Sequence, residues 1–96
     1  MTYDKQEILD ILENLVYTTK GNVYRDGNFR IYKFKSTLVI ELLNETKAYI
    51  SDILDDIDLS DEELKKNYAL WYSDLVKEVR SIYNKYNPIN PSTYFM

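Results

Sequence analysis

The chain of 96 residues contains neither cysteine nor histidine. Without cysteine it can form no disulfide and no thiolate metal site, which fits a reducing compartment. Without histidine it lacks the most common general base and the most common metal ligand. The serines and tyrosines therefore have no imidazole to activate them, and neighbouring acids such as Asp55 and Asp56 would point apart on a helix. We expect no enzymatic activity, no metal and no cofactor.

Glycine and long apolar runs are also scarce. Gly21 and Gly27 are the only glycines, too few for a phosphate-binding glycine loop. No apolar run approaches the ~20 residues of a membrane span. The N-terminus, MTYDKQE, is acidic and unlike a signal peptide. We therefore expect a cytoplasmic protein without membrane contact.

A calcium loop is suggested only weakly by the sequence around residue 56. Asp56, Asp58 and Ser60 match the first, third and fifth ligand positions of an EF-hand. Asp61 stands where that loop needs glycine, and Asn67 where it needs glutamate. The pattern does not predict a calcium site.

The strongest structural pattern lies in residues 59–86, which predict one long helix. Ser60 and Glu63 have the spacing of a capping box, and Asn87-Pro88 follows the last helical residue. Apolar residues recur at three- and four-residue steps on one stripe: Leu64, Tyr68, Trp71, Leu75, Val79, Ile82 and Tyr86. A helix of roughly 26 residues would be about 40 Å long. Such a helix could also hold a second copy of the chain as a homodimer.

Two further elements are predicted before it. A helix should run from Asp4 to Thr19, with Asp4 as its N-cap and Gly21 just after its end. A β-hairpin should join 22–25 to 28–35, because Asp26-Gly27 is a favoured two-residue hairpin turn.

The stretch from residue 37 to residue 58 is ambiguous. Thr37–Glu41 is rich in β-branched residues, yet the apolar residues from Val39 to Ile57 hold a helical phase. Lys35-Ser36 is a poor hairpin turn, since it contains neither Gly nor Asn. We favour a helix over 37–58; the alternative is a third strand at 37–43 followed by a helix from Asn44.

The expected fold is α+β and mainly helical, with three helices and a hairpin inserted after the first. The element order is α-β-β-α-α. Residues 1–87 should form a single compact domain, because 45% of the chain is hydrophobic. Residues 88–96 contain both prolines and should form an irregular tail.

Charge is unevenly distributed along the chain, whose formal net charge is −4. Residues 36–63 hold nine acids and one lysine, whereas residues 20–35 hold five bases and one acid. The acids can serve as a solvated helix face and as capping charges. They can also imitate nucleic-acid phosphates for a basic protein partner. The partner-binding candidates are Glu45, Asp52, Asp55, Asp56, Asp58, Asp61 and Glu62.

The basic hairpin supports an alternative function. Its cations alternate with aromatic residues, as in proteins that bind single strands or use a hairpin as a wing on DNA. The candidates for nucleic-acid binding are Arg25, Arg30, Lys33 and Lys35. The hairpin could instead neutralise the acidic segment, and the net negative charge argues against direct nucleic-acid binding. A third alternative is a structural protein that oligomerises through the long helix.

In size, charge and lack of Cys and His, the chain resembles small accessory proteins of bacteriophages and mobile elements. This resemblance is one of composition. It implies a viral protein in the host cytoplasm that binds and inhibits a nucleic-acid-handling enzyme, as anti-CRISPR inhibitors and DNA mimics do.

Overall fold

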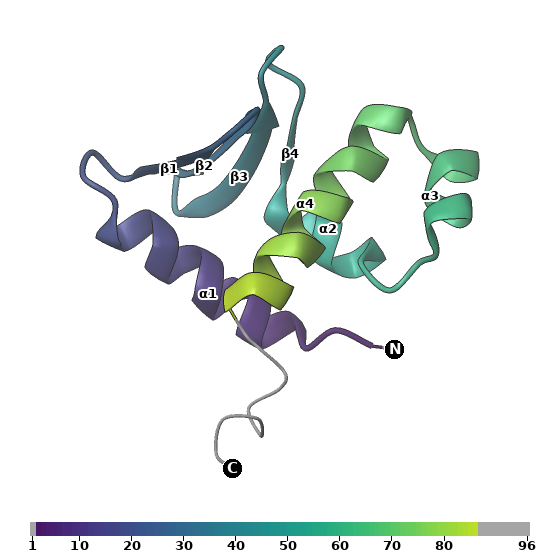
Figure 1. Cartoon of the computed structure of the whole chain (residues 1–96), viewed down its shortest axis with the longest axis horizontal. Coiled ribbons are helices and arrows are strands. Elements are labelled where there is room, and N and C mark those ends of the chain that lie inside the picture. Colours follow the sequence, from purple (N-terminus) through teal and green to yellow (C-terminus); the bar gives the residue numbers. More distant parts are fainter. Residues whose placement is uncertain (1, 87–96) are drawn as a thin grey trace.

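The computed structural model describes residues 2–86 (Figure 1). Along the chain, one helix precedes a four-stranded sheet and three helices follow it. The elements in chain order are α1 (Lys5–Thr18), β1 (Val23–Asp26), β2 (Phe29–Phe34), β3 (Thr37–Leu42), β4 (Lys47–Tyr49), α2 (Ile50–Asp56), α3 (Asp61–Asn67) and α4 (Leu70–Tyr86). The α+β class is confirmed, although the number of helices and strands differs from the prediction. The tail expected at 88–96 lies outside the described residues.

The sheet is antiparallel throughout, in the order β1-β2-β3-β4. One face packs against helices, with α1 on β1 and β2, and with α2 and α4 on β3 and β4 (Figure 1). Ile31 and Ile40 are fully buried on this inner face, where they join the core. Because strand residues alternate between faces, Arg30, Tyr32 and Phe34 lie on the opposite, outer face.

The predicted first helix is confirmed. The Asp4 side chain accepts hydrogen bonds from the backbone amides of Gln6 and Glu7, so it caps the helix as expected. Its apolar stripe, which includes Ile8, Leu12 and Val16, is buried against the sheet and α4.

The predicted hairpin is also confirmed, with its turn shifted by one residue. Asp26 pairs with Phe29, so the two-residue loop is Gly27-Asn28 rather than Asp26-Gly27. Gly27 has a φ of +61°, a conformation that glycine adopts without the penalty of a side chain.

The favoured helix over 37–58 is wrong. Residues 37–42 form β3, as the alternative held, but residues 47–49 add a fourth strand and α2 begins only at Ile50. β3 is a central strand buried on both faces, so its burial does not alternate and its sequence can match a helical period. The turn before it is Lys35-Ser36, whose φ angles of +52° and +69° are both positive, as a type I′ turn requires.

The single long helix at 59–86 is wrong as well. The capping box of Ser60 and Glu63 is present, but the helix ends at Asn67 and Tyr68 is extended. A second helix, α4, starts at Leu70. The break lets α3 fold back beside α4, where Leu64 becomes fully buried in the core. Much of the apolar stripe of α4 belongs to the core, since Leu75, Val79 and Ile82 are buried, so these residues are not available to a second copy of the chain.

No helix among residues 2–86 combines the length and the apolar character that crossing a membrane requires.

Candidate binding surfaces

The predicted acidic residues do not form one surface. Glu45 lies in the turn between β3 and β4, at the far end of β4 from α2 (Figure 1). The other six follow one another along α2, the α2–α3 connection and the start of α3: Asp52, Asp55, Asp56, Asp58, Asp61 and Glu62.

Three of these acids have structural partners within the chain. Asp56 accepts a hydrogen bond of 2.7 Å from the Tyr72 hydroxyl, and Asp58 accepts one of 3.0 Å from the Tyr3 backbone amide. Asp61 pairs with Arg80 at 2.7 Å. These contacts join α2 and α3 to α4 and to the N-terminal segment. Asp56, Asp58 and Asp61 therefore have a role in stabilising the fold.

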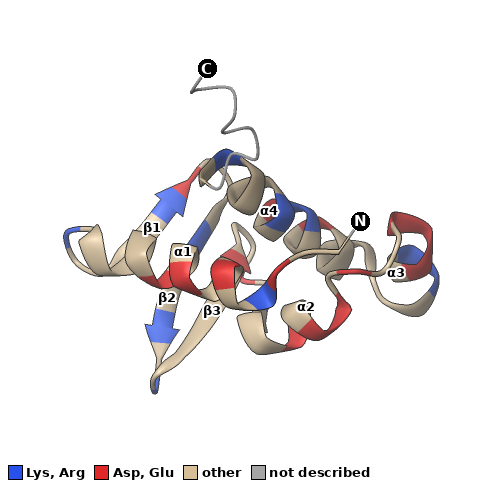
Figure 2. Cartoon of the chain, turned by 90° about the horizontal axis from the view of Figure 1, so that it is seen from below, with Lys and Arg blue, Asp and Glu red and all other residues tan. Residues whose placement is uncertain are grey.

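The remaining acids of this segment are available to a partner. Asp52, Asp55 and Glu62 are exposed, and none of them forms an ion pair with another described residue. We call these three residues the acidic surface. In Figure 2 acidic residues gather on α1, α2 and α3, whereas β1 and β2 carry basic residues.

The predicted basic residues are divided between the two faces of the sheet. Arg25 and Arg30 are direct cross-strand neighbours on the outer face. Lys33 is on the inner side, where its ammonium lies 3.4 Å from the Glu13 carboxylate of α1. Lys35 is in the β2–β3 turn, with its ammonium over the Phe34 ring. Lys33 therefore neutralises an acid within the chain instead of joining the arginines.

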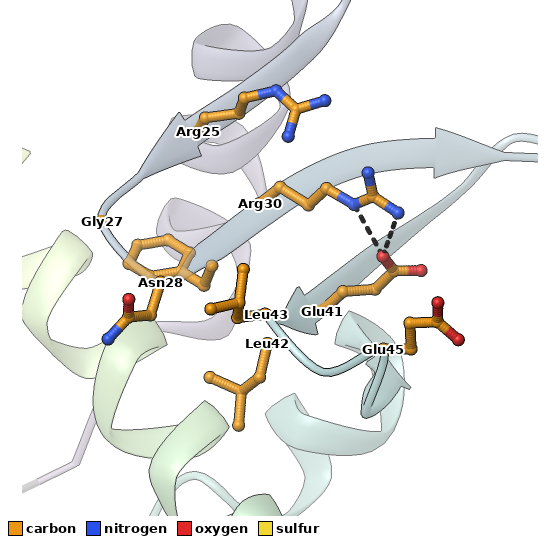
Figure 3. A pocket seen from close by; sticks show the side chains of 9 residues that line it. Arg25, Gly27, Asn28, Arg30, Glu41, Leu42, Leu43 and Glu45 are labelled. Carbon is orange, nitrogen blue, oxygen red and sulfur yellow. Dashed lines mark hydrogen bonds and ion pairs between the residues drawn. The ribbon is translucent and has the colours of Figure 1, made fainter.

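A row of charges crosses the outer face from β1 to β4, and Figure 3 shows its members on β1, β2 and β3. Its members are opposite one another in register: Arg25, Arg30, Glu41 and Lys47. Glu41 accepts a hydrogen bond of 2.6 Å from Arg30 Nε and one of 2.5 Å from the Tyr32 hydroxyl. We call these four residues the charged row. It combines three cations with one carboxylate.

The partners of Glu41 keep it ionised. Burial by itself would raise the pKa of Glu41, but the hydrogen bonds from Tyr32 and Arg30 outweigh burial and lower that pKa. Burial and the Glu41 carboxylate raise the pKa of Tyr32 to about 12. At neutral pH Tyr32 is therefore a hydrogen-bond donor to a charged carboxylate.

The charged row borders an open cavity of about 250 Å³ between the β1–β2 and β3–β4 turns (Figure 3). Arg25 and Arg30 line one side, and Leu43 and Glu45 line the other. Leu43 is 74% exposed, so the side of the cavity opposite the arginines includes an apolar side chain.

A second cavity, of about 280 Å³, lies where α4 begins beside β4. Four exposed or half-buried aromatic residues surround the buried Val39: Tyr32, Phe34, Tyr49 and Trp71. Lys47 and Asp52 are the charged residues at its wall. We call this cavity the aromatic pocket. Sequence reasoning missed it because it placed Tyr49 and Trp71 on the apolar stripes of helices. The alternation of Tyr32 and Phe34 along β2 was the signal that could have indicated it.

Neither a search for metal ligands among the described residues nor a comparison with known proteins identifies a further site. Residues 2–86 contain no group of three His, Cys, Asp or Glu side chains placed to hold a metal ion. Comparison of the chain with family models, with curated proteins and with solved structures gives no significant match.

Proposed function

We propose that the chain is a non-enzymatic binding protein that presents its acidic surface to the basic surface of a nucleic-acid-handling protein, and so acts as an inhibitor or accessory protein. The observation that carries the proposal is the exposure of Asp52, Asp55 and Glu62 without ion-pair partners among the described residues. Asp52 and Glu62 also lie in the first turns of α2 and α3, where a negative charge favours the helix, but neither is paired as Asp56, Asp58 and Asp61 are.

The electrostatics of such a contact favour fast association. Like charges gathered on one side of a small protein create a field that steers an oppositely charged partner toward that side. Lys77 and Arg80 of α4 pair with Asp61, whereas Lys65 and Lys66 of α3 lie within one turn of Glu62 and weaken the field there. The field is therefore strongest at Asp52 and Asp55. A partner with a groove for nucleic-acid phosphates would match the acidic surface in charge.

The proposal is tested with a charge-neutralised variant, D52N/D55N/E62Q. The wild-type chain should retain a nucleic-acid-binding protein on a column, and duplex DNA should displace that protein because both compete for one basic surface. Salt at about 0.5 M should release it too, since exposed charges are screened over a few ångströms at that concentration. The variant should retain at most a tenth as much.

A matched control removes the same number of charges elsewhere, by D26N/E45Q/D74N. These acids are exposed and lie at the end of β1, in the β3–β4 turn and on α4. The control variant should bind the partner as the wild-type chain does. Equal loss in both variants would indicate a net-charge effect, and retention despite duplex DNA would contradict competition for a nucleic-acid site.

A further inference from the structure

The outer face of the sheet has a feature that the proposed function does not use, namely its exposed aromatic side chains. Phe34 is 48% exposed, Tyr49 is 45% exposed and Trp71 is 40% exposed, all at the aromatic pocket. Several large rings that stay exposed at one place do not contribute the free energy that burying their apolar surface would give. A ligand that stacks on the rings would restore that burial.

The charged row beside the pocket indicates that this ligand is an anion. Arg25 lies directly opposite Arg30, and like charges in that position destabilise a sheet. Glu41 is committed to Arg30 and Tyr32, and Arg25 forms no ion pair within residues 2–86. The row therefore has an excess of positive charge, although the whole chain has a net charge of −4.

The aromatic pocket and the charged row are adjacent, because their residues lie two positions apart on the same strands. Tyr32 follows Arg30 by two residues on β2, and Tyr49 follows Lys47 by two residues on β4. Two residues of a strand span about 6.6 Å. A flexible chain in which flat rings alternate with anionic groups could therefore contact the aromatic pocket and the charged row together.

We propose that the outer face of the sheet binds single-stranded nucleic acid. One base stacks in the aromatic pocket, and the adjoining phosphates contact Arg25, Arg30 and Lys47. A cavity of about 280 Å³ is at the lower end of ligand-pocket sizes, so it suits one base better than a larger molecule. In a duplex the faces of the bases are stacked on one another and unavailable to such rings.

The folded arrangement overcomes the objection raised by net charge. The acids that make the chain negative gather on α1, α2 and α3, while β1 and β2 carry basic residues (Figure 2). Asp52 at the wall of the pocket would repel a phosphate. The strand should therefore run from the pocket toward β1 and away from α2.

The test uses the full chain and an unlabelled 12-nucleotide oligo(dT). Trp71 is the only tryptophan, so its fluorescence reports on the pocket directly. We expect a saturable change in Trp71 fluorescence at low salt, and much weaker binding of a duplex of equal length. The proposal is overturned if oligo(dT) leaves the fluorescence unchanged, if the duplex binds as tightly, or if polyglutamate competes as well as oligo(dT).

Substitutions separate stacking from charge. Phe34→Ala and Tyr49→Ala should each weaken binding about 5- to 140-fold, the range expected for one stacked base. Tyr17→Ala is the control, because Tyr17 is 81% exposed on α1 and should not affect binding. Circular dichroism verifies that each variant is folded. Equal weakening by Tyr17→Ala, or none by Phe34→Ala and Tyr49→Ala, would overturn the proposal.

Arg25→Ala should reduce the slope of log affinity against log salt by about 0.7, the value for one phosphate contact with a single strand. Lys66→Ala, which removes an exposed cation of α3, should leave the slope unchanged; equal slopes for the wild-type chain and Arg25→Ala would contradict the proposed phosphate contact. Asp55 and Glu62 do not line the aromatic pocket, although Asp52 does. D55N/E62Q should therefore still bind oligo(dT), and F34A should still bind the basic partner, so the two proposals fail separately.

Discussion

Arg80 of α4 and Asp61 of α3 form an ion pair in which Nη1 lies 2.7 Å from Oδ1. The same guanidinium donates to the Ile57 carbonyl oxygen at 3.1 Å and 2.8 Å, and to the carbonyl oxygen of Leu59. These carbonyls belong to the end of α2 and the connection to α3, where helical partners are lacking. One side chain of α4 therefore binds the α2–α3 connection at Ile57 and Leu59 and the start of α3 at Asp61.

Arg80→Met should destabilise the fold by about 2–4 kcal/mol, because it leaves two carbonyl groups and a carboxylate without their donor. Chemical unfolding in urea measures this loss. Lys77→Met is the control: the Lys77 ammonium is 4.0 Å from Asp61 and half exposed, so its removal should change stability by less than about 1 kcal/mol. Similar losses from both substitutions would show that Arg80 acts only as a surface charge.

Ser36→Gly should stabilise the chain by about 0.5–1 kcal/mol. Ser36 has a φ of +69° in the β2–β3 turn, a conformation that costs a residue with a side chain about 1–2 kcal/mol and costs glycine little. Gly27→Ala provides the reciprocal test in the neighbouring hairpin. An added Cβ there would meet no atom within 4 Å, so any loss of stability would come from its positive φ alone. Thermal midpoints should rise for the first substitution and fall for the second.

Glu41→Gln should lower stability at pH 7 by about 1–2 kcal/mol, since a neutral amide accepts weaker hydrogen bonds from Arg30 and Tyr32. The folded pKa of Glu41 is lowered below its unfolded value of about 4.3. Its contribution is therefore fully present above that value and is lost as the pH falls through the folded pKa. Urea unfolding at several pH values should show the two proteins converging in acid. Glu45→Gln, in the exposed turn nearby, should not reproduce this pattern.

Ser73→Ala should stabilise the chain by about 1 kcal/mol. Ser73 is fully buried in α4, and its hydroxyl oxygen has no hydrogen-bond partner among the described residues. Removing that hydroxyl avoids the cost of its desolvation, and alanine also has the higher helix propensity. Ser81→Ala, on the exposed side of the same helix, measures propensity alone. A gain no larger than that of Ser81→Ala would show that a water molecule already satisfies the Ser73 hydroxyl.

The sequence by itself determined the features that depend on a few neighbouring residues. Asp4 caps α1, Ser60 and Glu63 form a capping box, and Gly27 turns the first hairpin. Each acts through backbone groups within three residues of it, so its chemistry is nearly independent of the rest of the fold. The α+β class follows from these signals together with the apolar spacing of α1.

Tertiary structure decided the rest. Residues 37–42 form a strand because β2 and β4 pair with its two edges. Both faces of this strand are buried, so its sequence does not alternate between apolar and polar residues as a half-buried strand does. No glycine or proline marks the break after Asn67. The Arg80–Asp61 ion pair and the burial of Leu64 favour an α3 that packs beside α4 over one that projects. The tertiary structure also decided which acids have partners. Asp56, Asp58 and Asp61 are paired within the chain, whereas Asp52, Asp55 and Glu62 are exposed and form no ion pair with a described residue. Pairing between distant residues is a property of the folded chain, and therefore only the structure could separate the acids that pair within the chain from those that stay exposed.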